Sequence, residues 1–159
     1  MSSSNDAAKL NVQLPLADGP VSSNVKRLRA MYEALGRGDL ETLKTFFADD
    51  IMWDGRESYG IPILATRRGP EEAAGSFPAF RAQAVMHDSS RIVKFLDGGD
   101  TVVSWAEVSL TWKATGRRFT DKYVMNVFEF NDEGKVVRFT HAMDTHGLLL
   151  ATDPAVAGS

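Results

Sequence analysis

The sequence contains no cysteine and no long apolar run. Without cysteine the chain has no disulfide, no thiolate metal ligand and no thiol nucleophile, which suits a reducing compartment such as the cytoplasm. A membrane-spanning helix needs about eighteen consecutive apolar residues, and no such stretch occurs. The first residues form neither a basic start nor an apolar segment of signal-peptide length. We therefore expect a cytoplasmic protein that is neither secreted nor inserted in a membrane.

Basic clusters and cofactor motifs are also missing. The formal net charge is −3, and lysine and arginine form no stripe, so we expect no binding to nucleic acid. The 3 histidines share no short spacing and no HExxH motif is present, so we expect no metal site. Neither a phosphate-binding glycine loop nor a dinucleotide fingerprint occurs, and we expect no cofactor.

What the sequence does contain is the composition of one globular domain. Its 159 residues are 43% hydrophobic and 25% charged, which is enough to bury a single core. Small and polar residues dominate the beginning, where we expect a flexible arm over residues 1–22. The domain itself is expected over residues 23–151, and a C-terminal tail over residues 152–159.

Hydrophobic periodicity predicts helices first and a run of strands afterwards. This order marks an α+β domain, in which helices cover one face of a sheet. Apolar residues recur at helical spacing over residues 25–35, with Ser23 or Asn24 as N-cap and Gly36 as the end, and Asp39 can cap a second short helix. Further elements are expected as follows: a surface loop over residues 55–69, a helix from Pro70 that Pro78 kinks or splits, a helix over residues 145–151, and strands over residues 51–54, 85–96, 101–113, 119–130 and 136–143.

Four short motifs carry a resemblance to one superfamily. They are Gly38-Asp39-Leu40, Phe47-Ala48-Asp49-Asp50, Val127-Phe128-Glu129-Phe130 and Gly134-Lys135-Val136-Val137. By their order and spacing the chain resembles the nuclear transport factor 2-like and ketosteroid isomerase-like proteins, closest to the SnoaL-like polyketide cyclase group. The resemblance implies an α+β fold: a cone-shaped, cystatin-like roll with N-terminal helices packed on a strongly curved antiparallel sheet around an enclosed pocket. Such proteins include isomerases, cyclases, epoxide hydrolases, dehydratases and structural subunits, so the resemblance names no reaction.

The known sites of this superfamily map unevenly onto the chain. By the resemblance, the general-base aspartate of ketosteroid isomerases falls near Gly55, where Asp54 is the nearest carboxylate. Their oxyanion tyrosine would match Met31, which has no donor, and their oxyanion aspartate would match Asn126. The last-strand aspartate of limonene epoxide hydrolases would match His141. Polyketide cyclases use a carboxylate or a histidine for proton transfer, and the residues contradict this analogy least.

Alternation along the last two strands directs Asn126 and His141 toward the core, in step with the apolar residues of each strand. Since the two apolar faces must coincide, a four-residue turn at 132–135 fixes the pairing. The expected pairs are Phe130 with Val137, Phe128 with Phe139, and Asn126 with His141. Two opposed polar side chains in a core indicate either mutual hydrogen bonding that fixes strand register or a polar ligand.

We therefore expect a domain that binds a small hydrophobic molecule and acts as a cofactor-independent isomerase, cyclase or lyase on a carbonyl compound. His141 would be the acid or base and Asn126 the oxyanion donor, and Asp54 is either a second catalytic group or a solvated carboxylate. The expected pocket walls are Trp53, Tyr59, Phe128 and Phe139, with plain core packing as the alternative for Trp53.

Two further functions are open at this stage. The first is a non-catalytic ligand-binding or dimeric assembly module. The second is an epoxide hydrolase, which would need Asp54 or Glu107 to activate water, although strand alternation directs Glu107 outward. Trp105, Tyr123 and Met125 would form an apolar patch on the outer sheet face, through which we expect a homodimer.

Overall fold

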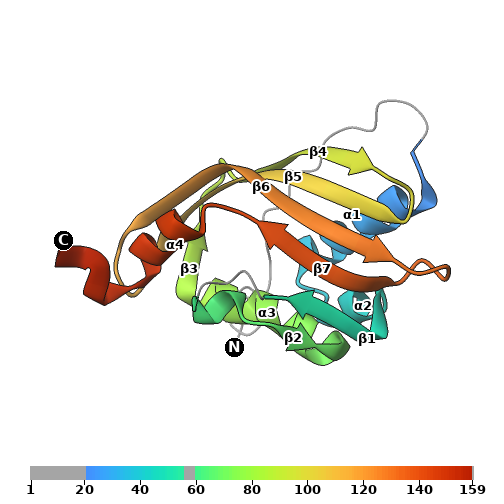
Figure 1. The fold of residues 1–159 in the computed structure, drawn as a ribbon, viewed down its shortest axis with the longest axis horizontal. Coiled ribbons are helices and arrows are strands. Elements are labelled where there is room, and N and C mark those ends of the chain that lie inside the picture. Colours follow the sequence, from blue (N-terminus) through green and yellow to red (C-terminus); the bar gives the residue numbers. More distant parts are fainter. Residues whose placement is uncertain (1–20, 56–59, 159) are drawn as a thin grey trace.

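The computed structural model describes residues 21–55 and 60–158, which form the expected α+β fold. A strongly curved 7-stranded sheet has the order β2-β1-β7-β6-β5-β3, with β4 also paired to β5. Figure 1 shows the sheet arching over α1, α2 and α3, with α4 across one end. The helices are α1 (Ser23–Arg37), α2 (Leu40–Lys44), η1 (Pro62–Leu64), α3 (Gly69–Gln83), α4 (Thr145–Thr152) and η2 (Pro154–Gly158). The strands are β1 (Phe47–Asp54), β2 (Arg67–Arg68), β3 (Ala84–Met86), β4 (Arg91–Asp97), β5 (Thr101–Trp112), β6 (Arg118–Phe130) and β7 (Val136–Ala142).

Helix α1 is capped one residue earlier and ends two residues later than the sequence predicts. The Ser22 hydroxyl accepts a hydrogen bond from the first turn at 3.2 Å, so the expected caps Ser23 and Asn24 lie inside the helix. The helix passes Gly36 and stops at Gly38, whose φ of 70° suits a residue without a Cβ. Three consecutive capping residues share the same chemistry, and only the packing of α1 decides which of them caps the helix.

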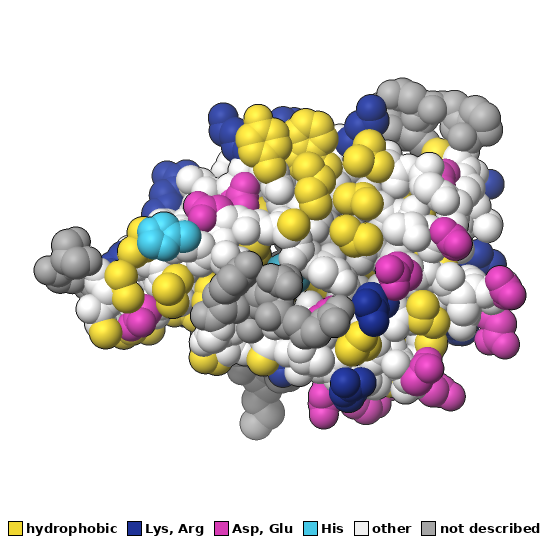
Figure 2. Space-filling model, viewed as in Figure 1, with side chains coloured by type: hydrophobic (Ala, Val, Ile, Leu, Met, Phe, Trp, Pro, Cys, Tyr) yellow, Lys and Arg dark blue, Asp and Glu magenta, His cyan; other side chains and the backbone are white. Residues whose placement is uncertain are grey.

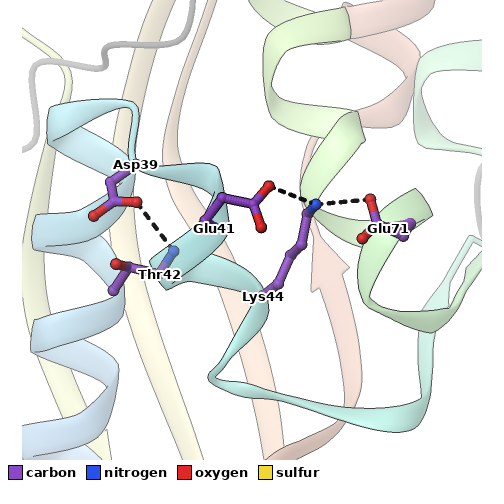
Figure 3. A network of polar contacts seen from close by, with 5 residues as sticks. All are labelled: Asp39, Glu41, Thr42, Lys44 and Glu71. Carbon is purple, nitrogen blue, oxygen red and sulfur yellow. Dashed lines mark hydrogen bonds and ion pairs between the residues drawn. The ribbon is translucent and has the colours of Figure 1, made fainter.

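Helix α2 begins where the sequence predicts and is tied to α3 by a lysine. The Asp39 carboxylate accepts a hydrogen bond from the backbone N–H of Thr42 at 3.0 Å. Figure 3 shows Lys44 between two carboxylates, 2.9 Å from Glu41 and 2.8 Å from Glu71 of α3. The hydrogen bond to Glu71, followed by that to Glu41, raises the pKa of Lys44. The ammonium group therefore links α2 to α3.

Strand β1 is longer than expected and has two unpredicted neighbours. It begins at Phe47 rather than Ile51 and runs parallel to β7. The expected surface loop over residues 55–69 contains η1 and the short strand β2, which pairs antiparallel with β1. Gly55 allows this close return, because a Cβ there would lie 2.1 Å from the backbone oxygen of Leu64.

The strand expected over residues 85–96 is two strands, β3 and β4, and both pair antiparallel with β5. The break falls between them, where the backbone N–H of His87 donates to the Ser109 carbonyl at 2.9 Å. The Ser90 hydroxyl donates to the same carbonyl at 2.9 Å. The hydrophobic pattern of residues 85–96 did not reveal this break, because β3 and β4 both pair with the same strand, β5.

Helix α3 continues through Pro78, so the expected split is absent. The aromatic residues on either side of the proline both pack on the sheet. The ring of Phe77 meets Trp53 at 5.2 Å between centroids, and that of Phe80 meets Trp112 at 6.3 Å. This packing offsets the hydrogen bond that a proline inside a helix lacks.

The β6–β7 hairpin has the predicted register except next to its turn. Two of the expected pairs are present: Phe128 with Phe139, and Asn126 with His141. Phe130 pairs with Val136 and not with Val137, because the register shifts by one residue between Glu129 and Phe130. The irregularity brings Val136 into the core, where it is buried.

The C-terminal part closes one end of the sheet. Asp144 caps α4 as predicted, since its carboxylate accepts a hydrogen bond from the backbone N–H of Gly147 at 2.8 Å. The helix includes Thr152, and η2 occupies most of the expected tail. Of the expected arm, only Val21 and Ser22 lie within the described residues. Within that described part of the chain, no helix is long and apolar enough to cross a membrane.

Candidate functional site

An apolar cavity of about 240 Å³ lies between two clusters of buried side chains. The α1 cluster contributes Met31, Tyr32, Trp53, Phe128 and Phe139 to the cavity wall. The α4 cluster, at the end closed by α4, contributes Leu64, Leu110, Phe119 and Leu148. Cavities of this kind, apolar with a few placed polar groups, are the usual form of a small-molecule site.

Three polar side chains form a hydrogen-bonded chain on the α1-cluster side. The Tyr32 and Ser104 hydroxyl oxygens lie 2.6 Å apart, and Asn126 Nδ2 donates to Ser104 Oγ at 3.3 Å. The three groups come from α1, β5 and β6. Tyr32 and Asn126 line the cavity, whereas Ser104 is fully buried behind them.

Either hydroxyl can be the donor of the bond between Tyr32 and Ser104. Since Asn126 donates to Ser104, the arrangement in which Ser104 in turn donates to Tyr32 uses the serine hydrogen and leaves the Tyr32 O–H for the cavity. Burial raises the pKa of Tyr32 to about 12, against the lowering effects of its hydrogen bonds to Ser104 and Asn126. Tyr32 is therefore a protonated donor at neutral pH.

His141 lies opposite Asn126 and faces the same cavity. Its ring packs against Phe139 at 5.5 Å between centroids, and no described residue forms a hydrogen bond with either ring nitrogen. Burial lowers the pKa of His141, which favours the neutral imidazole. Asn126 and His141 do not form a hydrogen bond with each other, and the amide donates to Ser104 instead.

The expected aromatic wall is present. Trp53 and Phe139 lie with ring centroids 3.8 Å apart, and Phe128 and Phe139 lie 4.9 Å apart. Trp53 is buried, so it belongs to the core as well as to the cavity wall. Tyr59 lies outside the described residues.

Asp54 does not join this site. It is 6% exposed, which contradicts a solvated carboxylate, but alternation along β1 turns it to the sheet face opposite that of Trp53. There its carboxylate lies 3.7 Å from the guanidinium of Arg138. Asp54 is not among the residues that line this cavity, and a catalytic role for it stays a prediction.

Comparisons with known proteins agree with this geometry. A SnoaL-like domain model matches residues 28–139. The chain belongs to the SnoaL-like domain family. A search of curated proteins finds no match to the chain. The match to the SnoaL-like model confirms the resemblance to this superfamily that the four sequence motifs indicated.

Solved structures show the same fold at low identity. An NTF2-like protein from Burkholderia xenovorans LB400 is 24% identical with a TM-score of 0.70, over 82% of this chain and 95% of that one. An LEH-like epoxide hydrolase from M. tuberculosis is 20% identical with a TM-score of 0.58, over 86% and 96%. A protein with a ketosteroid isomerase-like fold from Catenulispora acidiphila, in complex with trimethylamine, is 19% identical with a TM-score of 0.61, over 84% and 94%. These likenesses establish the fold, and they do not identify the reaction.

Tyr32 is a polar residue lining the cavity of this SnoaL-like domain that the sequence analysis did not single out. The resemblance put the oxyanion tyrosine at Met31, and periodicity could not correct it because both residues are buried on one side of α1. A signal was present in the tyrosine itself, since a buried phenol needs a hydrogen-bond partner. Ser104, flanked by the buried Val102 and Ala106 of its face, was that partner.

Glu107 lies at the rim of the cavity, not on the outer face where alternation placed it. The pairing of β5 with β6 shifts between Ala106 and Val108, which breaks the alternation at this residue. Its carboxylate lies 2.9 Å from Arg91 Nε, and the side chains of Glu107 and Arg91 are 29% and 52% exposed. The Arg91 hydrogen bond lowers the pKa of Glu107, so the pair is ionised at the solvent end of the site.

The outer face of the sheet carries an apolar patch, as expected. Figure 2 shows hydrophobic side chains gathered over the region of β4, β5 and β6. The rings of Trp105 and Tyr123 are stacked with centroids 5.8 Å apart, and Tyr123 is 66% exposed.

Within the described residues, no group of three or more His, Asp or Glu side chains could hold a metal ion.

Proposed function

We propose that this SnoaL-like domain is a cofactor-independent enzyme that transfers a proton on a small carbonyl compound. The observation that carries the proposal is the imidazole of His141, which faces an apolar cavity with no hydrogen-bond partner among the described residues. A histidine that only supports the fold has a partner. A neutral, unpartnered imidazole is instead available as a general base.

The donors beside His141 suit the charge that would develop. Loss of a proton from the carbon next to a carbonyl leaves negative charge on the carbonyl oxygen. With Ser104 as the donor of their bond, the Tyr32 O–H can donate to that oxygen, and the Asn126 amide has a second N–H besides the one bonded to Ser104. Preorganised donors in a water-poor cavity are the strongest known means of stabilising such an oxyanion.

The proposed step balances without any other reactant. The imidazole of His141 takes a proton from the α carbon, and the electron pair of that C–H bond moves into the enolate. In an isomerisation the imidazolium then returns the proton to another carbon of the conjugated enolate. In a ring closure the enolate carbon instead bonds to a second carbonyl carbon of the same molecule, the π pair of that C=O bond moves to its oxygen, and the imidazolium protonates the resulting alkoxide.

A second candidate function is a dimeric assembly module, and the exposed Tyr123, stacked on the half-buried Trp105, favours it. Dimerisation through this face is compatible with catalysis, because the patch and the cavity lie on opposite faces of the sheet. An epoxide hydrolase has less support. Its water-activating carboxylate would have to be Asp54, on the wrong face, or Glu107, which is paired with Arg91.

Exchange of α protons for solvent deuterium tests the proposed enzyme directly. With 2-tetralone as the probe, the native protein should accelerate exchange, and His141→Gln should lose about 10²–10⁴-fold of that rate. Tyr32→Phe should lose about 10²–10³-fold. His146→Gln, a change on exposed α4 surface, is the matched control and should keep the native rate. Binding of the ketone without any acceleration by the native protein would exclude the enzyme and leave a binding module.

A further inference from the structure

The polar and the apolar side chains of the cavity wall are separated: the polar groups lie at one end and hydrocarbon side chains form the other. Tyr32 and Asn126 lie with the α1 cluster, and His141 lies between Phe139 of that cluster and Met143, which packs against the α4 cluster. The far end is formed by apolar side chains from η1, α3, β6 and α4, namely Leu64, Phe80, Phe119 and Leu148. A ligand that satisfies both ends has an oxygen at one end only.

The interior carries no unpaired charge among the described residues. Its one ion pair, Arg91 with Glu107, lies at the partly exposed rim and neutralises itself. A buried charge on a ligand without a partner costs several kcal/mol. Neither a carboxylate nor an ammonium group of a ligand would find an opposite charge beside Tyr32 and Asn126. The electrostatics therefore favour a neutral ligand.

The volume limits the size of that ligand. A cavity of about 150 Å³ holds benzene, which corresponds to about 25 Å³ for each non-hydrogen atom. At the same ratio, the cavity of about 240 Å³ holds about ten such atoms. A fused multi-ring aglycone has more than twice this number and exceeds the volume of the cavity.

We infer that the site selects a neutral, monofunctional carbonyl compound of about ten non-hydrogen atoms. Its oxygen lies against Tyr32 and Asn126, and its hydrocarbon part points toward Phe119 and Leu148. The position of the oxygen rests on the proposed function, whereas the size limit rests on the cavity alone. Leu148, at the closed end, is then the residue that sets the longest ligand.

A series of straight-chain 2-ketones, from pentan-2-one to hexadecan-2-one, measures this limit by isothermal titration calorimetry. Affinity should rise by up to about fourfold for each added methylene. The rise should stop near nonan-2-one or decan-2-one, and longer ketones should bind more weakly. The matched 2-aminoalkanes and alkanoates should bind at least tenfold more weakly than the ketone of equal length.

Variants at the two ends separate the parts of this inference. Leu148→Ala should move the optimum by about three carbons toward longer chains, and Phe80→Leu, a smaller change, should move it in the same direction if Leu148→Ala does not fold. Tyr32→Phe should weaken all ketones by a similar factor and leave the optimum where it is.

The size limit and the proposed reaction fail in different ways. An affinity that keeps rising through hexadecan-2-one, or an amine that binds more tightly than its ketone, would overturn the inferred ligand even if α-proton exchange is catalysed. A clear optimum near ten atoms, without exchange on any bound ketone, would support the inferred ligand and refute proton transfer.

Discussion

Asn126 and His141 stand directly opposite each other on β6 and β7, yet the Asn126 amide donates to Ser104 of the neighbouring strand β5. The amide is thereby held away from the imidazole. His141 is left facing the cavity without a hydrogen bond from the described residues, and burial keeps it neutral. A pair that could have stabilised only the strand register instead presents an imidazole and an amide to one cavity.

The Ser104 hydroxyl should be worth more to the fold than its size suggests. Ser104→Ala leaves the buried Tyr32 oxygen and the Asn126 amide without their shared partner, so we expect a loss of about 1–3 kcal/mol in the free energy of unfolding. Urea denaturation measures the change. Ser89→Ala, at an exposed turn, is the control and should stay within about 0.5 kcal/mol of the native value. Equal stability of Ser104→Ala and the native protein would show that the hydrogen-bonded chain is not formed.

Acid should destabilise the protein partly through His141. Its pKa is lowered on folding from 6.5, so between that value and the folded pKa the unfolded chain binds more protons. The stability is therefore complete above about pH 6.5 and is lost as the pH falls through the folded pKa. Urea melts between about pH 7.5 and pH 5 should show a smaller loss for His141→Gln than for the native protein. Identical pH profiles for the two proteins would mean that the imidazole titrates in solvent.

Two glycine-to-alanine changes should have opposite effects. At Gly55 a Cβ would lie 2.1 Å from a backbone oxygen, which cannot yield cheaply, and we expect a loss of about 1–3 kcal/mol. At Gly75, on the exposed side of α3, a Cβ meets nothing within 4 Å, and alanine should add about 0.5–1 kcal/mol. Thermal melts of the two variants give the comparison. A Gly55→Ala protein as stable as the native one would contradict the close return of the chain after β1.

The outer sheet face should hold two copies of the chain together. We expect light scattering to give twice the chain mass of 17.4 kDa, because the exposed Tyr123 and its stacked neighbour Trp105 form a flat apolar surface. Tyr123→Glu should shift the mass to that of one chain while the α-proton exchange rate per chain is retained. A native mass near that of a single chain would contradict the dimer.

The parts of the fold that could be predicted from sequence are those set by local patterns. The α+β order, the caps Asp39 and Asp144, and the pairing of Asn126 with His141 all follow from spacing within one or two neighbouring elements. The parallel pairing of β1 with β7 could not be predicted, because it joins segments far apart in the chain. Nothing in the local pattern around residues 67–68 indicates β2, since two residues are too few to show a period.

Part of the candidate site could also be predicted from local sequence patterns. Strand alternation sufficed for His141, since the hairpin has no irregularity at that point. It failed for Glu107, where the pairing shifts. The burial of Asp54 was not predicted, because it depends on contacts outside β1. Tyr32 follows Met31, the position that the resemblance indicated, by one residue, which is one step of a helix and a change of about 100° in direction.

Nuclear magnetic resonance of the His141 ring nitrogens tests the central claim most directly, because it reports both the charge of the imidazole and its contact with a ligand. The protein labelled with nitrogen-15 in histidine is titrated with acid, alone and with saturating nonan-2-one, and His141→Gln identifies the signal. We predict a pKa below 6.5 that falls further when the ketone excludes water from the cavity. A His141 pKa at or above 6.5 that does not respond to the ketone would show that the imidazole is not part of the cavity.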